Sequence, residues 1–194
     1  MKSRRRPARG KVSSNKDISK KAAPGDLVDS MVEAWTRQHP ALDGLARGLV
    51  YRVLYINERF VAAQAKRLRR FHLTLGSYGV LAALRRIGPP FALTPSALVR
   101  ALALSSGGIS NLLVGMERRG LITRTRAAHD GRGVVVKLTA KGKTIVDAAA
   151  AEEAKAEVAL ARALPPKQRK ALSDLLRTVL LFIDAAPRRG KLHA

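Results

Sequence analysis

Apolar residues recur at every third or fourth position along most of this chain, which is the spacing of amphipathic helices. Three helices are predicted in the first half, over residues 26–38, about 42–71 and 75–86. The second has the longest apolar stripe, made by Leu42, Leu45, Leu49, Val53, Ile56 and Phe60. The Gly88-Pro89-Pro90 run ends this part of the chain, because neither residue type continues a helix readily.

Two short helices follow in tandem, over residues 96–103 and from 106 to about 119. Thr94 can cap the first, and Ser105 or Ser106 can cap the second. The second helix has four apolar residues at helical spacing, Ile109, Leu112, Leu113 and Met116. Two short helices joined by a tight turn indicate a helix-turn-helix.

The pattern then changes to that of strands. Residues 121–126 and 134–138 are rich in β-branched side chains, and the segment between them contains Asp130-Gly131, a pair that favours a hairpin turn. An alanine-rich helix from 140 to about 163 and a last one ending near 186 complete the chain. The predicted fold is therefore mainly α, a winged helix-turn-helix with a two-stranded β wing and long helices on both sides.

Charge divides the chain into a body and its tails. Lys and Arg number 37 against 14 Asp and Glu, a formal charge of +23, which favours a polyanionic partner: nucleic acid first, an acidic membrane surface second. Nine of the basic residues lie between Lys2 and Lys21. We expect a disordered basic tail over 1–23, a folded domain over 24–186 and a basic tail over 187–194. The first tail is either a solubilising segment or an arm that contacts DNA.

Several classes of function are disfavoured. The chain has no cysteine, and its four histidines are scattered, so neither a thiol switch nor a metal site is expected, and no cofactor is implied. No apolar run approaches the ~18 residues of a membrane span, and no signal peptide follows the basic start, which favours the cytoplasm. No nucleophile–base pair, phosphate loop or carboxylate pair indicates an enzyme.

The middle of the chain resembles the MarR family of bacterial transcriptional regulators. The run LTPSALVRALALSSGGISNLLVGMERRGLITR is similar to the family's helix-turn-helix and its glycine-leucine exit, and DGRGVVVKLTAKG is similar to its wing. With the flanking helices, the resemblance covers roughly residues 26–186. It implies a homodimer, built by the N- and C-terminal helices, that binds a pseudo-palindromic site in double-stranded DNA near the nucleoid.

By this resemblance the second short helix enters the major groove, and the wing arginine Arg132 enters the minor groove, with Asp130 holding the hairpin. The small residues at the start of that helix would let its backbone approach DNA closely. The residues expected to contact DNA are Ser105, Ser106, Gly107, Ser110, Asn111, Arg118, Arg124, Arg126, Asp130 and Arg132. Leu112, Val114 and Gly115 stand where many relatives have charged residues, so phosphate contacts and DNA shape are expected to contribute much of the affinity.

The first helix is similar to the extra N-terminal helix of a branch that responds to urate and to aromatic acids, where a tryptophan lines the effector pocket. Trp35 matches that tryptophan, but Gly79 and Leu112 replace an aspartate and an arginine of the urate branch, which disfavours urate. We expect a small aromatic carboxylate, such as a nicotinate derivative, to release a repressor from DNA. The candidate effector-binding residues are Trp35, His39, Arg47, Tyr51, Arg52, His72 and Tyr78. The alternative is a general basic nucleoid or RNA-binding protein.

Overall fold

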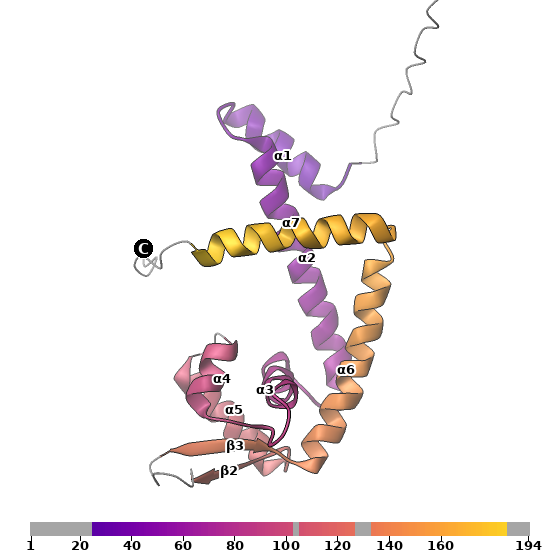
Figure 1. The fold of residues 1–194 in the computed structure, drawn as a ribbon. Helices are drawn as coiled ribbons and strands as arrows, with labels where there is room; N and C mark the ends of the chain where they lie inside the picture. Colours follow the sequence, from indigo (N-terminus) through magenta and orange to yellow (C-terminus); the bar gives the residue numbers. More distant parts are fainter. Residues whose placement is uncertain (1–24, 103–104, 127–132, 186–194) are drawn as a thin grey trace, which may run out of the picture. The chain divides into compact units, whose positions relative to one another are not determined.

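The computed structural model describes residues 25–102, 105–126 and 133–185. Its elements are α1 (Leu27–Gln38), α2 (Gly44–Leu68), the 3-10 turn η1 (Arg69–Phe71), α3 (Leu75–Arg86), β1 (Ala92–Leu93), α4 (Pro95–Leu102), α5 (Ser106–Arg118), β2 (Ile122–Arg126), β3 (Val134–Leu138), α6 (Ala140–Ala161) and α7 (Pro166–Ala185) (Figure 1). The chain forms two compact units: the first ends at Asn57, the second begins at Glu58, and α2 continues from one into the other.

The predicted order of elements is confirmed, with small changes at their ends. The helix expected to continue to Phe71 is α-helical only to Leu68 and finishes as η1. Of the two serines that could cap α5, Ser105 is the cap, and its side chain accepts a hydrogen bond from the Gly108 N–H. Both predicted tails, 1–23 and 187–194, lie outside the described residues.

The wing belongs to a sheet with one more strand than predicted. β2 and β3 form the expected antiparallel hairpin, in which Arg126 lies opposite Val134. β1 pairs with the other edge of β3, with Ala92 opposite Lys137, so the strand order is β1-β3-β2. A strand of two residues has no visible alternation in the sequence, and only its pairing with β3 defines it.

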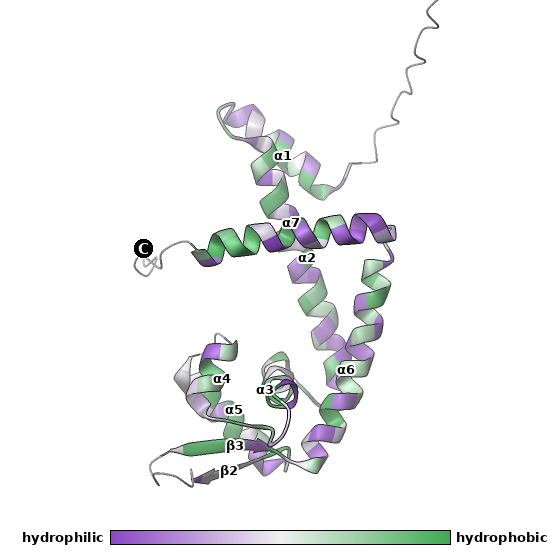
Figure 2. Ribbon diagram, in the orientation of Figure 1, coloured by the Kyte–Doolittle hydropathy of each residue, from purple (hydrophilic) through white to green (hydrophobic). Residues whose placement is uncertain are grey.

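The second unit has one hydrophobic core, which lies between α3, α4, α5, α6 and the sheet. Figure 2 shows apolar residues in α3, α4 and β3 of this unit. Its buried members are Leu68, Leu73, Val80, Leu81, Ala83, Leu84, Leu98, Ile109, Leu113, Met116, Leu121, Ile122, Val136, Leu138, Val146 and Ala149. The core therefore fixes α5 and the wing hairpin on one support.

The first unit is a helical hairpin in which α1 packs against α2 at two glycines. Gly44 and Gly48, one turn apart on α2, let α1 approach closely: a Cβ at Gly44 would lie 3.1 Å from a methyl of Val32 and 3.3 Å from one of Thr36. At its start α1 is joined to α2 by charge, because Arg52 donates to the carboxylates of Asp26 and Asp29. This pairing lowers the pKa of the Asp26 carboxyl below its ordinary value.

A bidentate ion pair joins the end of α2 to α6 in the second unit. The Arg67 guanidinium donates to both oxygens of Glu153, at 2.9 and 2.7 Å. Glu153 is buried, and Arg67 also lies over the Phe60 ring, 5.8 Å from its centroid. Removing either partner would leave a charge in a poorly hydrated place, so the pair fixes how these two helices meet.

The start of α6 is fixed against the exit of α5. The Thr139 hydroxyl donates to the Gly120 and Leu121 carbonyls, at 2.8 and 3.0 Å, and accepts from the Gly142 N–H. The two backbones approach so closely that a Cβ at Gly142 would lie 2.1 Å from the Leu121 carbonyl oxygen. We call this contact the α5–α6 junction; only glycine fits at residue 142.

Replacing Gly142 by alanine is expected to lower the free energy of unfolding by about 3 kcal/mol or more, because backbone rather than a flexible side chain must move. Gly115→Ala is the matched control: a Cβ there meets nothing within 4 Å, so alanine is expected to stabilise α5 by up to about 1 kcal/mol. Urea unfolding of both variants measures the difference. Equal stabilities would contradict the described junction.

Candidate nucleic-acid interface

α5 presents one apolar face to the core and a different face to solvent. Ile109, Leu113 and Met116 are buried in the core. The opposite side has an outward stripe of exposed or small residues at helical spacing, which consists of Gly107, Ser110, Asn111, Val114 and Arg118. The sequence-predicted residues Ser110, Asn111 and Arg118 therefore lie together on the outer surface of α5, as the helical period requires.

The glycines of α5 differ in their surroundings. At Gly107 and at Gly115 a Cβ would meet nothing within 4 Å, whereas at Gly108 it would lie 3.1 Å from the Ser105 hydroxyl that caps the helix. Among the described residues, no neighbouring atom requires glycine at 107 or 115.

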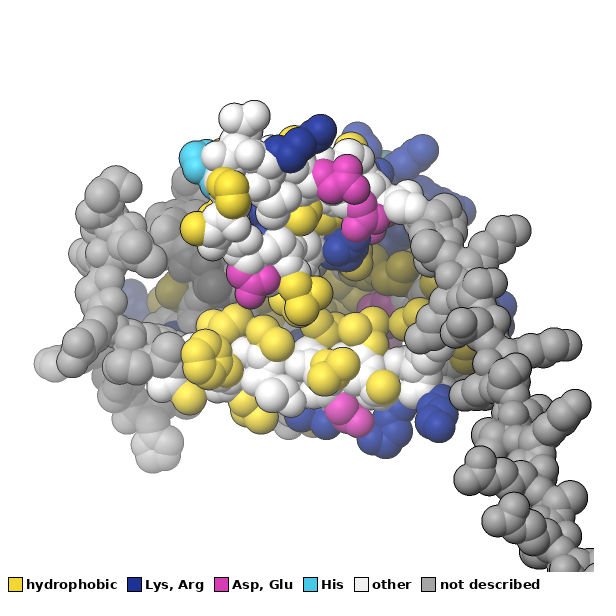
Figure 3. All heavy atoms as spheres, turned by 90° about the horizontal axis from the view of Figure 1, so that it is seen from above, with side chains coloured by type: hydrophobic (Ala, Val, Ile, Leu, Met, Phe, Trp, Pro, Cys, Tyr) yellow, Lys and Arg dark blue, Asp and Glu magenta, His cyan; other side chains and the backbone are white. Residues whose placement is uncertain are grey.

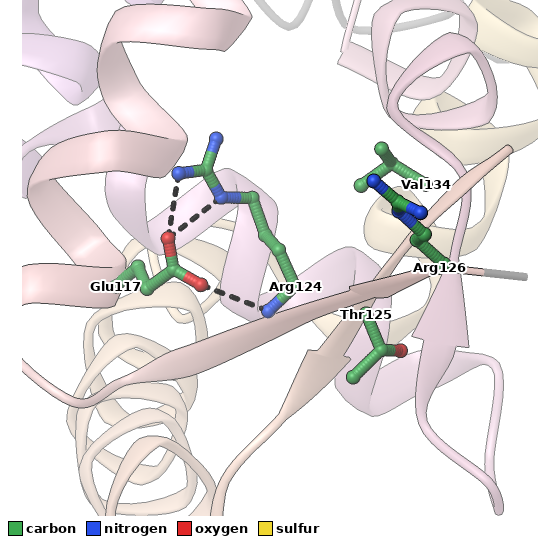
Figure 4. A pocket seen from close by; sticks show the side chains of 5 residues that line it. All are labelled: Glu117, Arg124, Thr125, Arg126 and Val134. Atoms are coloured by element: carbon green, nitrogen blue, oxygen red, sulfur yellow. Dashed lines mark hydrogen bonds and ion pairs between the residues drawn. The ribbon is translucent and has the colours of Figure 1, made fainter.

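Arg124 on β2 is bound to Glu117 in the last turn of α5 (Figure 4). One carboxylate oxygen accepts from the Arg124 backbone N–H at 3.0 Å, and the other accepts from its guanidinium at 2.7 and 2.6 Å. This pairing lowers the pKa of the Glu117 carboxyl. The pair joins α5 to the wing and neutralises the only carboxylate of α5.

Arg126, two residues further along β2, projects from the same face of the hairpin as Arg124 (Figure 4). Together with Glu117, Thr125 and Val134 these residues line a shallow hollow of about 240 Å³. The wing tip, with Asp130 and Arg132, lies outside the described residues.

Four of the seven candidate effector residues gather in the first unit. The Arg47 guanidinium lies over the Trp35 ring, 4.9 Å from its centroid, and over Tyr51 at 5.5 Å, and it donates to the Tyr51 hydroxyl at 2.9 Å. His39 stacks on Trp35 with ring centroids 5.5 Å apart. We call these four residues the Trp35 cluster.

The other three candidates have different surroundings. Arg52 donates to Asp26 and Asp29 at the start of α1. His72 and Tyr78 belong to the second unit: His72 follows η1 in a left-handed conformation, and Tyr78 packs against the core, where burial raises the pKa of its hydroxyl.

Sequence reasoning missed Glu117. Its seven-residue separation from Arg124 crosses a helix end and a strand start, so no regular period indicates the pair. Only charge could have indicated this pair. A carboxylate close to a surface that is expected to bind phosphate repels the phosphate unless a cation lies beside it.

Among the described residues, no group of three or more His, Asp or Glu could hold a metal ion. In the same part of the chain no single helix is long and apolar enough to span a membrane; only α4 and α5 together, a bent pair, meet that test by length and composition.

Comparison with known proteins gives related regulators. PecS of Dickeya dadantii, an HTH-type transcriptional regulator, is 30% identical over 123 residues, which are 62% of this chain and 72% of PecS. SarZ of Staphylococcus saprophyticus, another HTH-type transcriptional regulator, is 34% identical over 101 residues, 52% of this chain and 67% of SarZ. The named relatives are regulators, not enzymes.

Solved structures give the same fold. Apo MarR from E. coli matches with a TM-score of 0.60 at 24% identity, over 68% of this chain and 96% of MarR. The S. aureus MepR–DNA complex matches with a TM-score of 0.61 at 25% identity, over 68% of this chain and 95% of MepR. Residues 73–133, which include α3, α4, α5 and β2, match the MarR family. The chain belongs to the MarR family of winged helix-turn-helix transcriptional regulators.

Proposed function

We propose that this protein is a homodimeric, sequence-specific DNA-binding repressor that a small aromatic carboxylate releases from its operator. The observation that carries the DNA part is the outward stripe of α5, where small and polar side chains cover a recognition helix whose opposite face is fixed in the core. The DNA-bound structure of MepR, which has the same fold, supports this assignment.

In the proposed complex the first turns of α5 lie in the major groove. The absence of a side chain at Gly107 allows close approach, and the Asn111 amide can donate to and accept from the edge of an adenine. Arg118 is placed for a phosphate, and Ser105 and Ser106 lie where the chain enters the helix. The contacts thus combine base recognition with a large electrostatic contribution.

The wing supplies the second contact. Arg126 is exposed on the hairpin face that carries Arg124, and Arg124 offsets the charge of Glu117, so phosphate meets no net repulsion there. The resemblance assigns Arg132 to the minor groove and Asp130 to the hairpin. A narrow minor groove concentrates negative potential and attracts arginine.

The dimer is proposed from the surface of α7. None of its residues is buried, and Figure 3 shows apolar side chains gathered along this helix. Its exposed large apolar residues are Leu172, Leu175, Leu176, Val179, Leu180, Leu181, Phe182 and Ile183. An apolar surface of this extent in a regulator is expected to be covered by a second copy of the chain.

Analytical sedimentation at micromolar concentration is expected to give twice the mass of one chain. The double variant Leu176→Asp/Leu180→Asp is expected to shift the protein to monomer, because it places charges in the centre of the apolar face. Thr178→Asp, on the polar side of α7 next to Asp174, is the control and should leave the dimer intact. A monomeric wild type would contradict the dimer.

The DNA proposal is tested by selecting bound fragments from the source genome and repeating the binding in excess nonspecific DNA. We expect one class of fragments with half-sites ~10 bp apart to remain bound. Asn111→Ala is expected to weaken this complex by about 1–3 kcal/mol and to relax the preference at one base pair.

Arg86→Gln, an exposed cation at the end of α3, is the control and should bind like the wild type. If the competitor removes every fragment equally, the protein is a general nucleic-acid binder and the proposal of sequence-specific repression fails.

The effector is proposed to bind at the Trp35 cluster. The Arg47 guanidinium is already oriented by Trp35 and Tyr51, and its other N–H groups can donate to a carboxylate while an aromatic ring replaces His39 on the indole. Arg52 is the less suitable cation, because two aspartates already bind it.

The protein is titrated with nicotinate, salicylate and urate. Nicotinate and salicylate are expected to change Trp35 fluorescence and to release operator DNA, and urate is expected to do neither. A ligand that prefers the non-binding state by ~3 kcal/mol would lower DNA affinity more than a hundredfold. Arg47→Gln should abolish release, and Arg37→Gln, an exposed cation of the same unit, should not. Undiminished release from Arg47→Gln would place the effector elsewhere.

A further inference from the structure

A second shallow hollow, of about 190 Å³, opens on the flank of α5 that faces α3. Its lining residues are Thr74, Ser77, Asn111, Leu112, Gly115, Met116 and Arg119. We call it the Gly115 hollow. None of the sequence-predicted contacts except Asn111 belongs to it.

The hollow exists because residue 115 has no side chain. A Cβ at Gly115 would meet nothing within 4 Å, so the space in front of it is open. Leu112 and the buried Met116 form an apolar floor, and polar groups of Thr74, Asn111 and Arg119 stand among the lining residues. The hollow thus joins an apolar surface to hydrogen-bond donors and one cation.

Size and charge restrict what can enter. Sites for free small molecules have about 300–1,000 Å³, so a hollow of about 190 Å³ fits only part of a larger molecule. None of its lining residues is acidic. A second cation lies next to Arg119, because the Lys141 ammonium donates to the Arg119 carbonyl at 2.9 Å. An anionic segment of a polymer fits these properties.

The helical period places this hollow and the wing hollow on opposite sides of the outward stripe of α5. Gly115 and Arg119 lie on one side of the stripe, and Glu117, which lines the wing hollow, lies on the other. A helix in the major groove has a phosphate row on each side, since the groove is about 12 Å wide. Each flank of α5 thus has a hollow with at least one arginine at its edge.

We propose that the Gly115 hollow receives a deoxyribose-phosphate unit of the DNA strand that borders the major groove on the α3 side. The sugar lies on Leu112, the phosphate accepts from the Arg119 guanidinium, and Gly115 keeps the space open. This inference rests on the proposed insertion of α5 into the major groove.

The test uses Arg119→Gln and Gly115→Leu in the full chain, with the selected operator and with nonspecific DNA. Arg119→Gln is expected to weaken both complexes by about tenfold and to reduce the slope of log affinity against log salt by about one. Gly115→Leu fills the hollow and is expected to weaken both complexes without lowering the melting temperature. Arg86→Gln, at the other end of α3, is the matched control and should change neither affinity nor slope.

Operators with a single uncharged methylphosphonate, moved along each strand, then locate the contact. We expect one position at which the methylphosphonate lowers the DNA affinity of the wild type but not that of Arg119→Gln. This comparison does not depend on whether Gly115→Leu folds. The inference would be overturned if Arg119→Gln kept the wild-type slope of log affinity against log salt. It would also be overturned if each methylphosphonate lowered the affinity of both proteins equally. Either result would leave the proposed function intact. If the wild type itself shows no preference for any selected fragment, the proposed function fails instead.

Discussion

A side chain at residue 142 would occupy the place of the Leu121 carbonyl, and the arrangement of the whole winged helix depends on this contact. The α5–α6 junction joins the end of α5, the proposed recognition helix, to the start of α6. Thr139 bonds to both sides of it, and Lys141 adds a bond to the Arg119 carbonyl. A rotation of α6 relative to α5 would have to break these hydrogen bonds or move the Leu121 backbone, so the contact holds the two helices in one arrangement.

Charge serves two purposes in this protein. Surplus cations, such as Arg118 and Arg126, are exposed where phosphate is proposed to bind. Some carboxylates join elements of the fold: the buried Glu153 holds α2 to α6, and Glu117 holds α5 to the wing. With 14 acidic residues against 37 basic ones, each such pair both fixes two elements and leaves the outer surface strongly positive.

Helices, their caps and the strands of the wing were predictable because local patterns determine them, as with the Thr94 hydroxyl, which accepts from the Ala97 N–H, and with the paired strands β2 and β3. The family resemblance supplied the role proposed for α5. β1 was missed because its two residues have meaning only beside β3, and the Glu117–Arg124 pair was missed for the same reason. Four of the effector residues suggested by the resemblance lie together in the Trp35 cluster, but nothing in the sequence indicated that two aspartates bind Arg52.

The three glycines of α5 have a consequence for its dynamics. Relative to alanine, each destabilises a helix interior by up to about 1 kcal/mol, so α5 depends on Ile109, Leu113 and Met116 for its order. We expect amides near its start to exchange with solvent through local opening, which requires less free energy than global unfolding. In the proposed DNA complex, part of the free energy of association would then be used to hold this segment in its helical form.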